Sequence, residues 1–431
     1  MIRAVVISGL ATVTLAASTV VLARTSCDDL RANLKSPNAR VREVAAATLG
    51  KTRCQDSVTP LAALARDADG KVRLAVVKAL RELRDPAAVP ALTTLLGDGL
   101  APVREEAIDG LVDVYSERDR PPAVERLLGA FSDTIDTYRI PSDVRVDPAA
   151  VPALGRLLHD DVAAVRKTAA VALGVLRGQS ARAELTAALQ DPDPGVRAEV
   201  VTAMEKIGAR AEGKALVPLL TDESGDVRSR TLHALGALGV REAGPALREA
   251  WESNRRKEWE QRILEPMARV RDPALRDVFL ALVQDSDPQR RRFGIEGLAR
   301  ISEASLLPAL KKDYQREGSE DLRLAYCFAL ALLGDRVFVD SIVLALPRRP
   351  VGLRCHDYLV ELGPSFLPEL TPYLQDPSAD VRAALVDVIA DMETPEALPA
   401  IEGLLNDANG NVVDRATLAV ARLKRLTRVV R

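Results

Sequence analysis

The chain has 431 residues, of which 47% are apolar and 28% are charged, and its 59 Lys and Arg nearly balance its 61 Asp and Glu. This composition is typical of a folded globular chain and excludes a disordered one. A net charge of −2, with only 6 Phe, 6 Tyr and 2 Trp, offers little attraction for a polyanion and few rings for stacking bases, so we expect no nucleic-acid partner.

Residues 1–23 have the pattern of a secretory signal peptide. Arg3 precedes an uncharged run over 4–23, and Val21 and Ala23 occupy the −3 and −1 positions of a cleavage site. An uncleaved anchor is the alternative, because 20 uncharged residues can just span a bilayer, and a lipid on Cys27 is a weaker third possibility. We therefore expect an exported protein, periplasmic or extracellular, which contacts the inner membrane only if residues 4–23 are retained.

Export would permit disulfides. Cys27 opens the first expected helix and Cys54 follows the second, so an antiparallel hairpin would bring both to the same end. We predict a Cys27–Cys54 disulfide, with free thiols as the alternative. Cys327 and Cys355 lie on neighbouring expected helices, and the pattern leaves their pairing open.

A repeat of about 31 residues runs along the rest of the chain. Each unit has apolar residues at offsets 0, 4, 7, 8 and 11, which share one face of a helix that we call helix B. A second apolar stretch, helix A, precedes it and often begins with Asp-Pro, as at Asp85 and Asp147, where the carboxylate can cap the first turn. The helix B frames start at Val41, Val72, Val103, Val165, Val196, Val227, Trp259, Arg290, Leu322, Val351, Val381 and Val412.

Two residue types mark the turn between helices A and B. An Asp lies five residues before the frame, as at Asp191, and an Arg lies one residue after it, as at Arg197. With these markers the units resemble HEAT repeats, particularly the short type named after the phycobilisome lyases. The resemblance covers nearly all of residues 24–431 and implies an all-α, right-handed α-solenoid of about 12 to 13 stacked antiparallel hairpins, in which the Asp and Arg residues form a structural ladder.

The period fails at two places. The frames at Val103 and Val165 are 62 residues apart, and the irregular stretch 132–147 between them is either a loop with a function or, more commonly, a decayed repeat. Residues 254–257 replace the usual Asp-containing turn with Asn-Arg-Arg-Lys. We predict that basic clusters at the A to B turns line one rim of the solenoid, where they could bind an anionic partner or could simply be solvated: Arg255, Arg256, Lys257, Arg290, Arg348 and Arg349.

Apolar residues also fall on the exposed side of helix B near the C-terminal third. Phe328 at offset 6 and Leu324 at offset 2 should face the concave surface, as should Leu353 and Val360 in the next unit. Together with Arg292 they form a predicted partner-binding patch. The alternative is a frame at Val351 shifted by two residues, which would place Leu353 in the core.

Catalytic and metal-binding patterns are missing from the sequence. It contains no C-x-x-C, H-E-x-x-H, Walker or G-x-S-x-G pattern in a suitable setting, and its three His residues lie in separate repeats. We therefore expect no catalytic residue, metal or cofactor. The leading hypothesis is a non-catalytic scaffold of the bacterial cell envelope that binds protein partners, and the alternative is a bilin lyase-like or other ligand-handling enzyme.

Overall fold

The computed structural model describes residues 26–116, 145–253 and 257–430, and these residues form helices and turns without a β-strand. The expected signal peptide and most of the irregular stretch 132–147 lie outside this description, as do Arg255 and Arg256. The all-α class predicted from the 31-residue period is confirmed.

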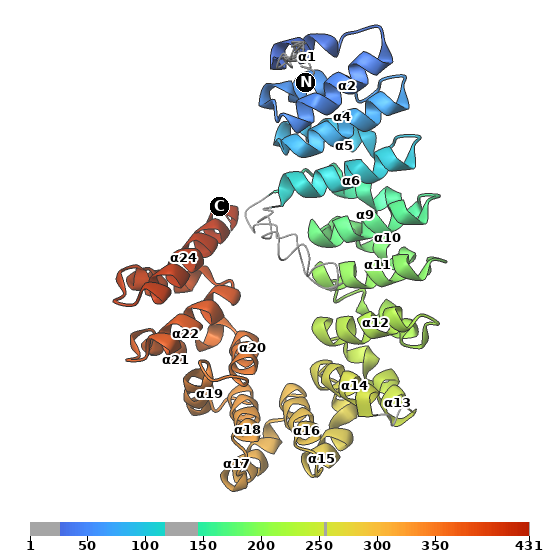
Figure 1. The fold of residues 1–431 in the computed structure, drawn as a ribbon. Helices are drawn as coiled ribbons and strands as arrows, with labels where there is room; N and C mark the ends of the chain where they lie inside the picture. The colour runs from blue at the N-terminus through green and yellow to red at the C-terminus, as the bar shows by residue number, and fades with distance from the viewer. Residues whose placement is uncertain (1–25, 117–144, 254–256, 431) are drawn as a thin grey trace, which may run out of the picture.

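The helices pair into antiparallel hairpins stacked in chain order (Figure 1). Most A helices are short, and a 3-10 turn directly precedes them. The A positions are α1 (Cys27–Asn33), α3 (Val58–Ala62), α5 (Val89–Leu95), α8 (Ala150–Arg156), α10 (Arg182–Ala188), the 3-10 segment η6 (Gly213–Thr221), α13 (Gly244–Ser253), α15 (Arg276–Val283), α17 (Leu307–Arg316), α19 (Val339–Ala345), α21 (Leu367–Leu370) and α23 (Leu398–Glu402). The B positions are α2 (Ala39–Lys51), α4 (Gly70–Leu83), α6 (Ala101–Tyr115), α9 (Ala163–Val175), α11 (Pro194–Lys206), α12 (Gly225–Leu238), α14 (Lys257–Arg269), α16 (Pro288–Arg300), α18 (Glu320–Leu332), α20 (Gly352–Leu362), α22 (Ala379–Asp391) and α24 (Gly410–Val430).

The Asp-Pro starts cap their helices as expected. The side chain of Asp85 accepts a hydrogen bond from the N–H of Ala87 at 2.8 Å, and Asp147 does the same for Ala149. Pro86 fixes φ in the first turn and has no backbone N–H that would need a hydrogen-bond acceptor.

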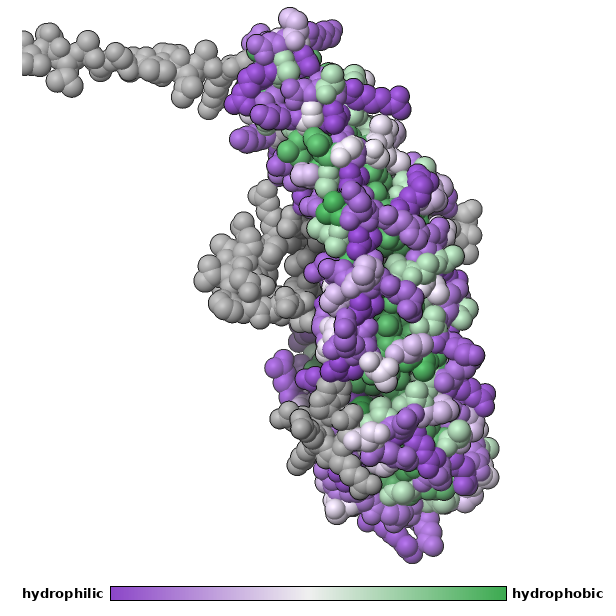
Figure 2. Space-filling view, turned by 90° about the vertical axis from the view of Figure 1, so that its right-hand side faces the viewer, coloured by the Kyte–Doolittle hydropathy of each residue, from purple (hydrophilic) through white to green (hydrophobic). Residues whose placement is uncertain are grey.

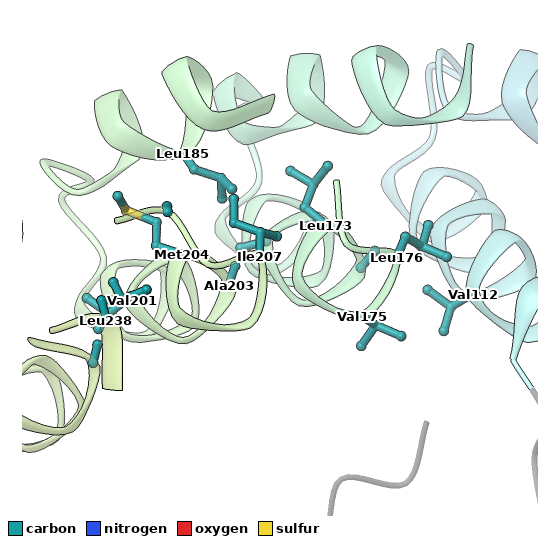
Figure 3. Close-up of a cluster of buried hydrophobic side chains, with 14 of the residues drawn as sticks. Val112, Leu173, Val175, Leu176, Leu185, Val201, Ala203, Met204, Ile207 and Leu238 are labelled. Atoms are coloured by element: carbon teal, nitrogen blue, oxygen red, sulfur yellow. The ribbon is translucent and has the colours of Figure 1, made fainter. Parts of the chain in front are cut away.

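One continuous apolar core runs along the stack, because each hairpin buries its apolar face against its neighbours. Figure 3 shows Leu173 of α9, Leu185 of α10 and Met204 of α11 in one apolar cluster, and all three are fully buried. Successive B helices approach closely at small residues: a Cβ added at Gly50 of α2 would lie 2.6 Å from the Cα of Ala79 in α4.

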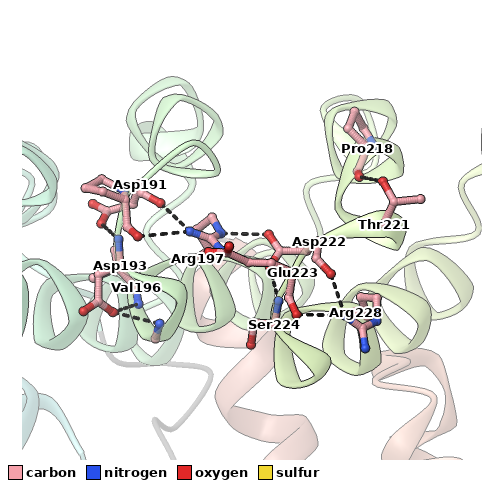
Figure 4. A network of polar contacts seen from close by, with 12 residues as sticks. Asp191, Asp193, Val196, Arg197, Pro218, Thr221, Asp222, Glu223, Ser224 and Arg228 are labelled. Carbon is pink, nitrogen blue, oxygen red and sulfur yellow. Dashed lines mark hydrogen bonds and ion pairs between the residues drawn. The ribbon is translucent and has the colours of Figure 1, made fainter.

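The predicted Asp and Arg ladder joins consecutive turns (Figure 4). Arg197 donates Nε and Nη2 to the two carboxylate oxygens of Asp222 at 2.8 and 2.9 Å, and its Nη1 donates to the backbone carbonyl of Asp191. Asp222 in turn accepts from the N–H of Ser224, and Arg197 lowers the pKa of this carboxyl group. Equivalent rungs join Arg42 to Asp67, Arg73 to Asp98, Arg166 to Asp191 and Arg382 to Asp407.

The ladder crosses the 62-residue gap without a missing step. Arg104 after the Val103 frame pairs with Asp160, 2.7 Å away, and α6 packs directly on α9. Tyr115 at the end of α6 accepts a hydrogen bond from the N–H of Asp147 at 3.0 Å. The two hairpins on either side of residues 117–144 are therefore neighbours in the stack.

The stack bends sharply between α13 and α20, so that two arms face each other (Figure 1). In both arms the turns between helices A and B lie on the outer edge, and the C-terminal ends of α6 and α24 point toward the space between the arms. Figure 2 shows the outer edge of the N-terminal arm, where hydrophilic side chains cover most of the surface and apolar ones are visible between them. Turns at this edge are thus solvated, apart from the ladder.

Ladder chemistry changes within the bend. Arg291 lies 3.7 Å from Glu317, and Arg323 donates to the hydroxyl of Tyr314, instead of forming the two-point Arg–Asp rungs found in the arms. The contact of Arg291 with Glu317 joins consecutive turns, whereas that of Arg323 with Tyr314 lies within one hairpin. A single contact fixes the separation of two turns less tightly than a two-point pair.

Candidate functional site

A groove near the bend is lined by residues of α12, α14, α16, α20 and α22. We call it the bend groove. Its volume is about 900 Å³, and Arg292, Leu353 and Val360 of the predicted partner-binding patch are among its lining residues. A groove of this size, with one strongly exposed apolar side chain and several charges, can accept a side chain or a short segment of another molecule.

Three buried polar residues and the partly exposed Glu361 hold the two walls of the groove together. Arg300 of α16 donates to both carboxylate oxygens of Glu361 in α20, with Nε–Oε1 and Nη2–Oε2 distances of 2.9 Å. Its Nη1 also donates to Glu296 at 3.2 Å. Tyr358 of α20 donates its hydroxyl to Glu296 at 2.6 Å. We call Arg300, Glu361, Glu296 and Tyr358 the clasp.

The clasp is an ion-pair network with little access to water. The side chain of Arg300 is 3% exposed and that of Glu296 is 6% exposed. Burial by itself would raise the pKa of Glu361, but the hydrogen bonds from Arg300 and the positive charges of Arg300, Arg271 and Arg269 together outweigh burial, and the pKa is lowered. Burial and the carboxylate of Glu296 both raise the pKa of Tyr358, which therefore stays protonated and donates. Each buried charge is thus matched, as stability requires.

The predicted exposure of Phe328 and Leu324 is wrong. Phe328 is fully buried and Leu324 is 5% exposed, because α20 packs across the face of α18 that other hairpins leave open. The ring of Phe328 stacks on Tyr358 with a centroid distance of 4.3 Å, and the guanidinium of Arg300 lies 5.1 Å from the Phe328 centroid. Phe328 therefore packs against Tyr358 and Arg300 of the clasp and presents no surface to a partner.

The frame at Val351 is correct, and the alternative shifted by two residues is wrong. Cys355, Tyr358, Leu359 and Leu362, at offsets 4, 7, 8 and 11, are all buried. Leu353 at offset 2 is 83% exposed, the most exposed large apolar side chain of the described residues. Val360 is half-buried beside it, and the guanidinium of Arg292 donates to Glu296 at 3.1 Å.

The predicted basic rim does not form a continuous cationic surface among the described residues. Arg290 pairs with Glu260 at 2.5 Å and with Asp285 at 3.3 Å, and Arg348 pairs with Glu320. Arg349 is exposed. Lys257 begins α14, while Arg255 and Arg256 lie outside the described residues. Acidic neighbours therefore offset much of the charge on which the rim hypothesis depends.

Titratable groups near the bend groove are paired with one another. His356 of α20 places Nε2 3.1 Å from Asp391, and its pKa is raised by Asp357 and Asp391. His233 is 3.0 Å from Glu205, which raises its pKa as well. Within the described ranges no three His, Cys, Asp or Glu side chains converge as metal ligands. No helix in those ranges is long and apolar enough to cross a membrane.

The structure joins Cys27 to Cys54 by a disulfide, with the two Cα atoms 6.0 Å apart. The bond closes the first hairpin at the end where α1 begins and α2 has just finished. Cys327 and Cys355 are buried free thiols, and burial raises the pKa of Cys355 to about 12. Neither thiol is therefore activated as a nucleophile.

Sequence reasoning missed Arg300, Glu361 and Tyr358. The repeat pattern identifies residues that contact adjacent hairpins. The clasp instead joins α16 to α20, which belong to hairpins separated by the hairpin of α18. One signal was present: the frames at Leu322 and Val351 are only 29 residues apart, the shortest spacing along the chain.

A curved stack of antiparallel helical hairpins with one continuous core and a polar ladder along its outer turns defines an α-solenoid. A sequence model described as HEAT repeats matches residues 27–112, 60–139, 182–265 and 364–429. These matches cover more than half of the chain, which therefore belongs to the HEAT-repeat family.

Solved structures with similar arrangements are remote in sequence. An engineered protein has 18% identity and a TM-score of 0.39, covering 92% of this chain and 98% of its own. The CpcE and CpcF complex of phycocyanin lyase from Nostoc sp. has 22% identity and a TM-score of 0.32, covering 63% and 93%. Importin beta has 12% identity and a TM-score of 0.42, covering 94% and 66%. No curated protein matches the chain significantly, and these scores give no ground for transferring a function.

Proposed function

We propose that this protein is a non-catalytic scaffold that binds a protein partner in the bend groove. The observation that carries the proposal is Leu353, an 83% exposed leucine at a groove whose walls are fixed by buried ion pairs. An exposed apolar anchor on a preformed surface loses little entropy on binding, and such anchors contribute much of the affinity of protein interfaces.

Two further features support a scaffold over an enzyme. The charged groups around the groove bond to one another, as in the pairs Arg300–Glu361 and His356–Asp391, and are thereby held away from a role in acid-base chemistry. The repeats also provide a large surface whose shape is set before any partner arrives, which suits binding more than turnover.

We further propose that the scaffold acts outside the cytoplasm, in the bacterial cell envelope. The uncharged run over residues 4–23 has the composition of an export signal, and a Cys27–Cys54 disulfide is suited to an oxidising compartment. Intact-mass measurement of the protein from its native host tests this: loss of about the first 23 residues is expected, and a full-length reduced chain would contradict it.

The scaffold proposal is tested by crosslinking the tagged protein in an envelope fraction and identifying what it retains. Leu353→Asp should lose a specific partner, because an aspartate cannot occupy an apolar contact without an unmatched charge. Val337→Asp is the matched control, since Val337 is 76% exposed and lies away from the groove. Both variants must keep the parent's circular dichroism. Equal retention of all partners by Leu353→Asp would refute binding in the bend groove.

A further inference from the structure

A second groove lies on the helix B surface of the N-terminal arm, far along the chain from the bend groove. Residues of α2, α4 and α6 line it, and its volume is about 1060 Å³. Its lining includes apolar and small side chains, among them Val44, Ala47, Leu74 and Ala75. Val44 is 48% exposed, so this strip is open to solvent. We call it the N-terminal groove.

Cations outnumber carboxylates around this strip. The lining contains Arg40, Lys51, Arg53, Lys71, Lys78, Arg81 and Arg84, against Glu43, Glu82, Glu106 and Asp113. Several of these carboxylates are already bound: Arg81 donates to Glu106 at 2.9 Å and to Asp113 at 2.6 Å. Arg53 is 4.0 Å from Glu82, a weak contact between two largely exposed groups.

Lys51 and Lys71 are the cations most available to a ligand. Both are exposed, and the described residues place no carboxylate within 4.0 Å of either ammonium group. Lys51 ends α2 whereas Lys71 lies in the first turn of α4. Since neighbouring B helices run in the same direction, these lysines lie at opposite edges of the groove with the apolar strip between them.

From this arrangement we infer that the N-terminal groove binds an extended acidic segment of a partner protein, with small apolar residues placed between its carboxylates. The carboxylates would meet Lys51 and Lys71, and the apolar residues would cover the strip around Val44 and Leu74. In the repeat register Lys51 and Lys71 are eleven positions apart, about 16 Å along the helix axes. With adjacent helices about 9 Å apart, the two lysines are separated by about 19 Å, which an extended segment of about six residues spans. The site is separate from the bend groove and does not depend on the function proposed there.

Fluorescence anisotropy with short labelled peptides tests the inference. The probe alternates Glu with Ala and Val, and the comparison peptides carry Gln or Lys in place of each Glu. The parent should bind the Glu peptide more tightly than either comparison peptide, and added salt should weaken the binding because exposed charges are screened. Absence of binding, or equal affinity for the Gln peptide, would overturn the inference.

Charge reversal locates the site. Lys51→Glu combined with Lys71→Glu should weaken binding of the Glu peptide at least about tenfold, since two attractive contacts become repulsive. The control is Lys214→Glu combined with Lys312→Glu, which changes the net charge equally at exposed lysines outside the groove. Equal weakening by both double variants would contradict a local site. Displacement of the peptide by a lower concentration of single-stranded DNA would instead identify a polyanion site and overturn the protein-segment assignment.

Discussion

Arg300 contacts three residues at once, and its side chain is almost fully buried. Its guanidinium bonds Glu361 and Glu296 and lies over the ring of Phe328. Replacement by an uncharged side chain of similar length would remove the cation that Glu296 and Glu361 share. The buried Glu296 would keep only its hydrogen bonds from Tyr358 and Arg292. Breaking a buried network in this way typically costs about 3–5 kcal/mol.

We therefore predict that Arg300→Met lowers the free energy of unfolding by about 3–5 kcal/mol, measured by urea denaturation followed by circular dichroism. Arg276→Met is the control, because Arg276 is 44% exposed and forms an ion pair with Glu303 on the surface. Its substitution should change stability little. Similar effects of the two substitutions would show that the clasp contributes no more than a surface pair.

The clasp should also make stability depend on pH. The pKa of Glu361 is lowered in the folded protein from 4.5, so its ionised form is stabilised by folding. This contribution is fully present above the unfolded pKa and is lost as the pH falls through the lower, folded pKa. The parent should thus be more stable than Glu361→Gln at pH 7, with the difference shrinking below about pH 4.5. A difference independent of pH would contradict this account.

At the scale of the helix, each ladder rung ties the turn of one hairpin to the next. In Asp222→Asn the amide nitrogen would face the donors of Arg197, so one of two hydrogen bonds is lost along with the ion pair. We predict a loss of about 1 kcal/mol in unfolding free energy. Glu223→Gln is the control, because the Glu223 side chain is 82% exposed and makes only a long contact, 3.5 Å, with the same guanidinium. A larger effect of the control would show that the rung is dispensable.

Helix pairing and the ladder could be predicted from the sequence because both depend on contacts between adjacent elements. Offsets 4, 7, 8 and 11 identify the buried residues even in the irregular Val351 unit, as the burial of Cys355 and Tyr358 shows. The marker Arg104 also finds its partner Asp160 across 56 residues, because the partner is defined by stacking order and not by sequence distance. Local periodicity is sufficient wherever a hairpin meets only its neighbours.

The surface near the bend could not be predicted in the same way. Offset 6 is open in hairpins whose neighbours stack regularly, as at Lys78 and His233, yet the same offset is closed at Phe328. The difference arises from α16 and α20 meeting across α18, a contact two hairpins apart that no single repeat encodes. Leu353 and Val360, which the sequence places on the open side of their helix, line the bend groove because this helix remains in frame; their binding of a partner stays a prediction.

At the scale of the whole molecule, we attribute the bend of the stack to different contacts along its outer and inner edges. Two-point Arg–Asp rungs hold the outer turns at regular spacing in the arms, and they give way to single contacts in the bend. On the inner side the clasp draws α16 and α20 together. The bend groove thus owes its shape to an ion-pair network, and a partner that binds there meets a surface already formed.

Small-angle X-ray scattering in solution tests this central claim most directly. The parent should give the scattering profile of the two-armed shape in Figure 1, and Arg300→Met should open the arms and increase the radius of gyration while helix content is kept. Glu361→Gln should open them to a smaller degree, since the amide can still accept one hydrogen bond from Arg300. An extended parent, or a folded Arg300→Met with the parent's profile, would contradict the claim that the clasp sets the bend.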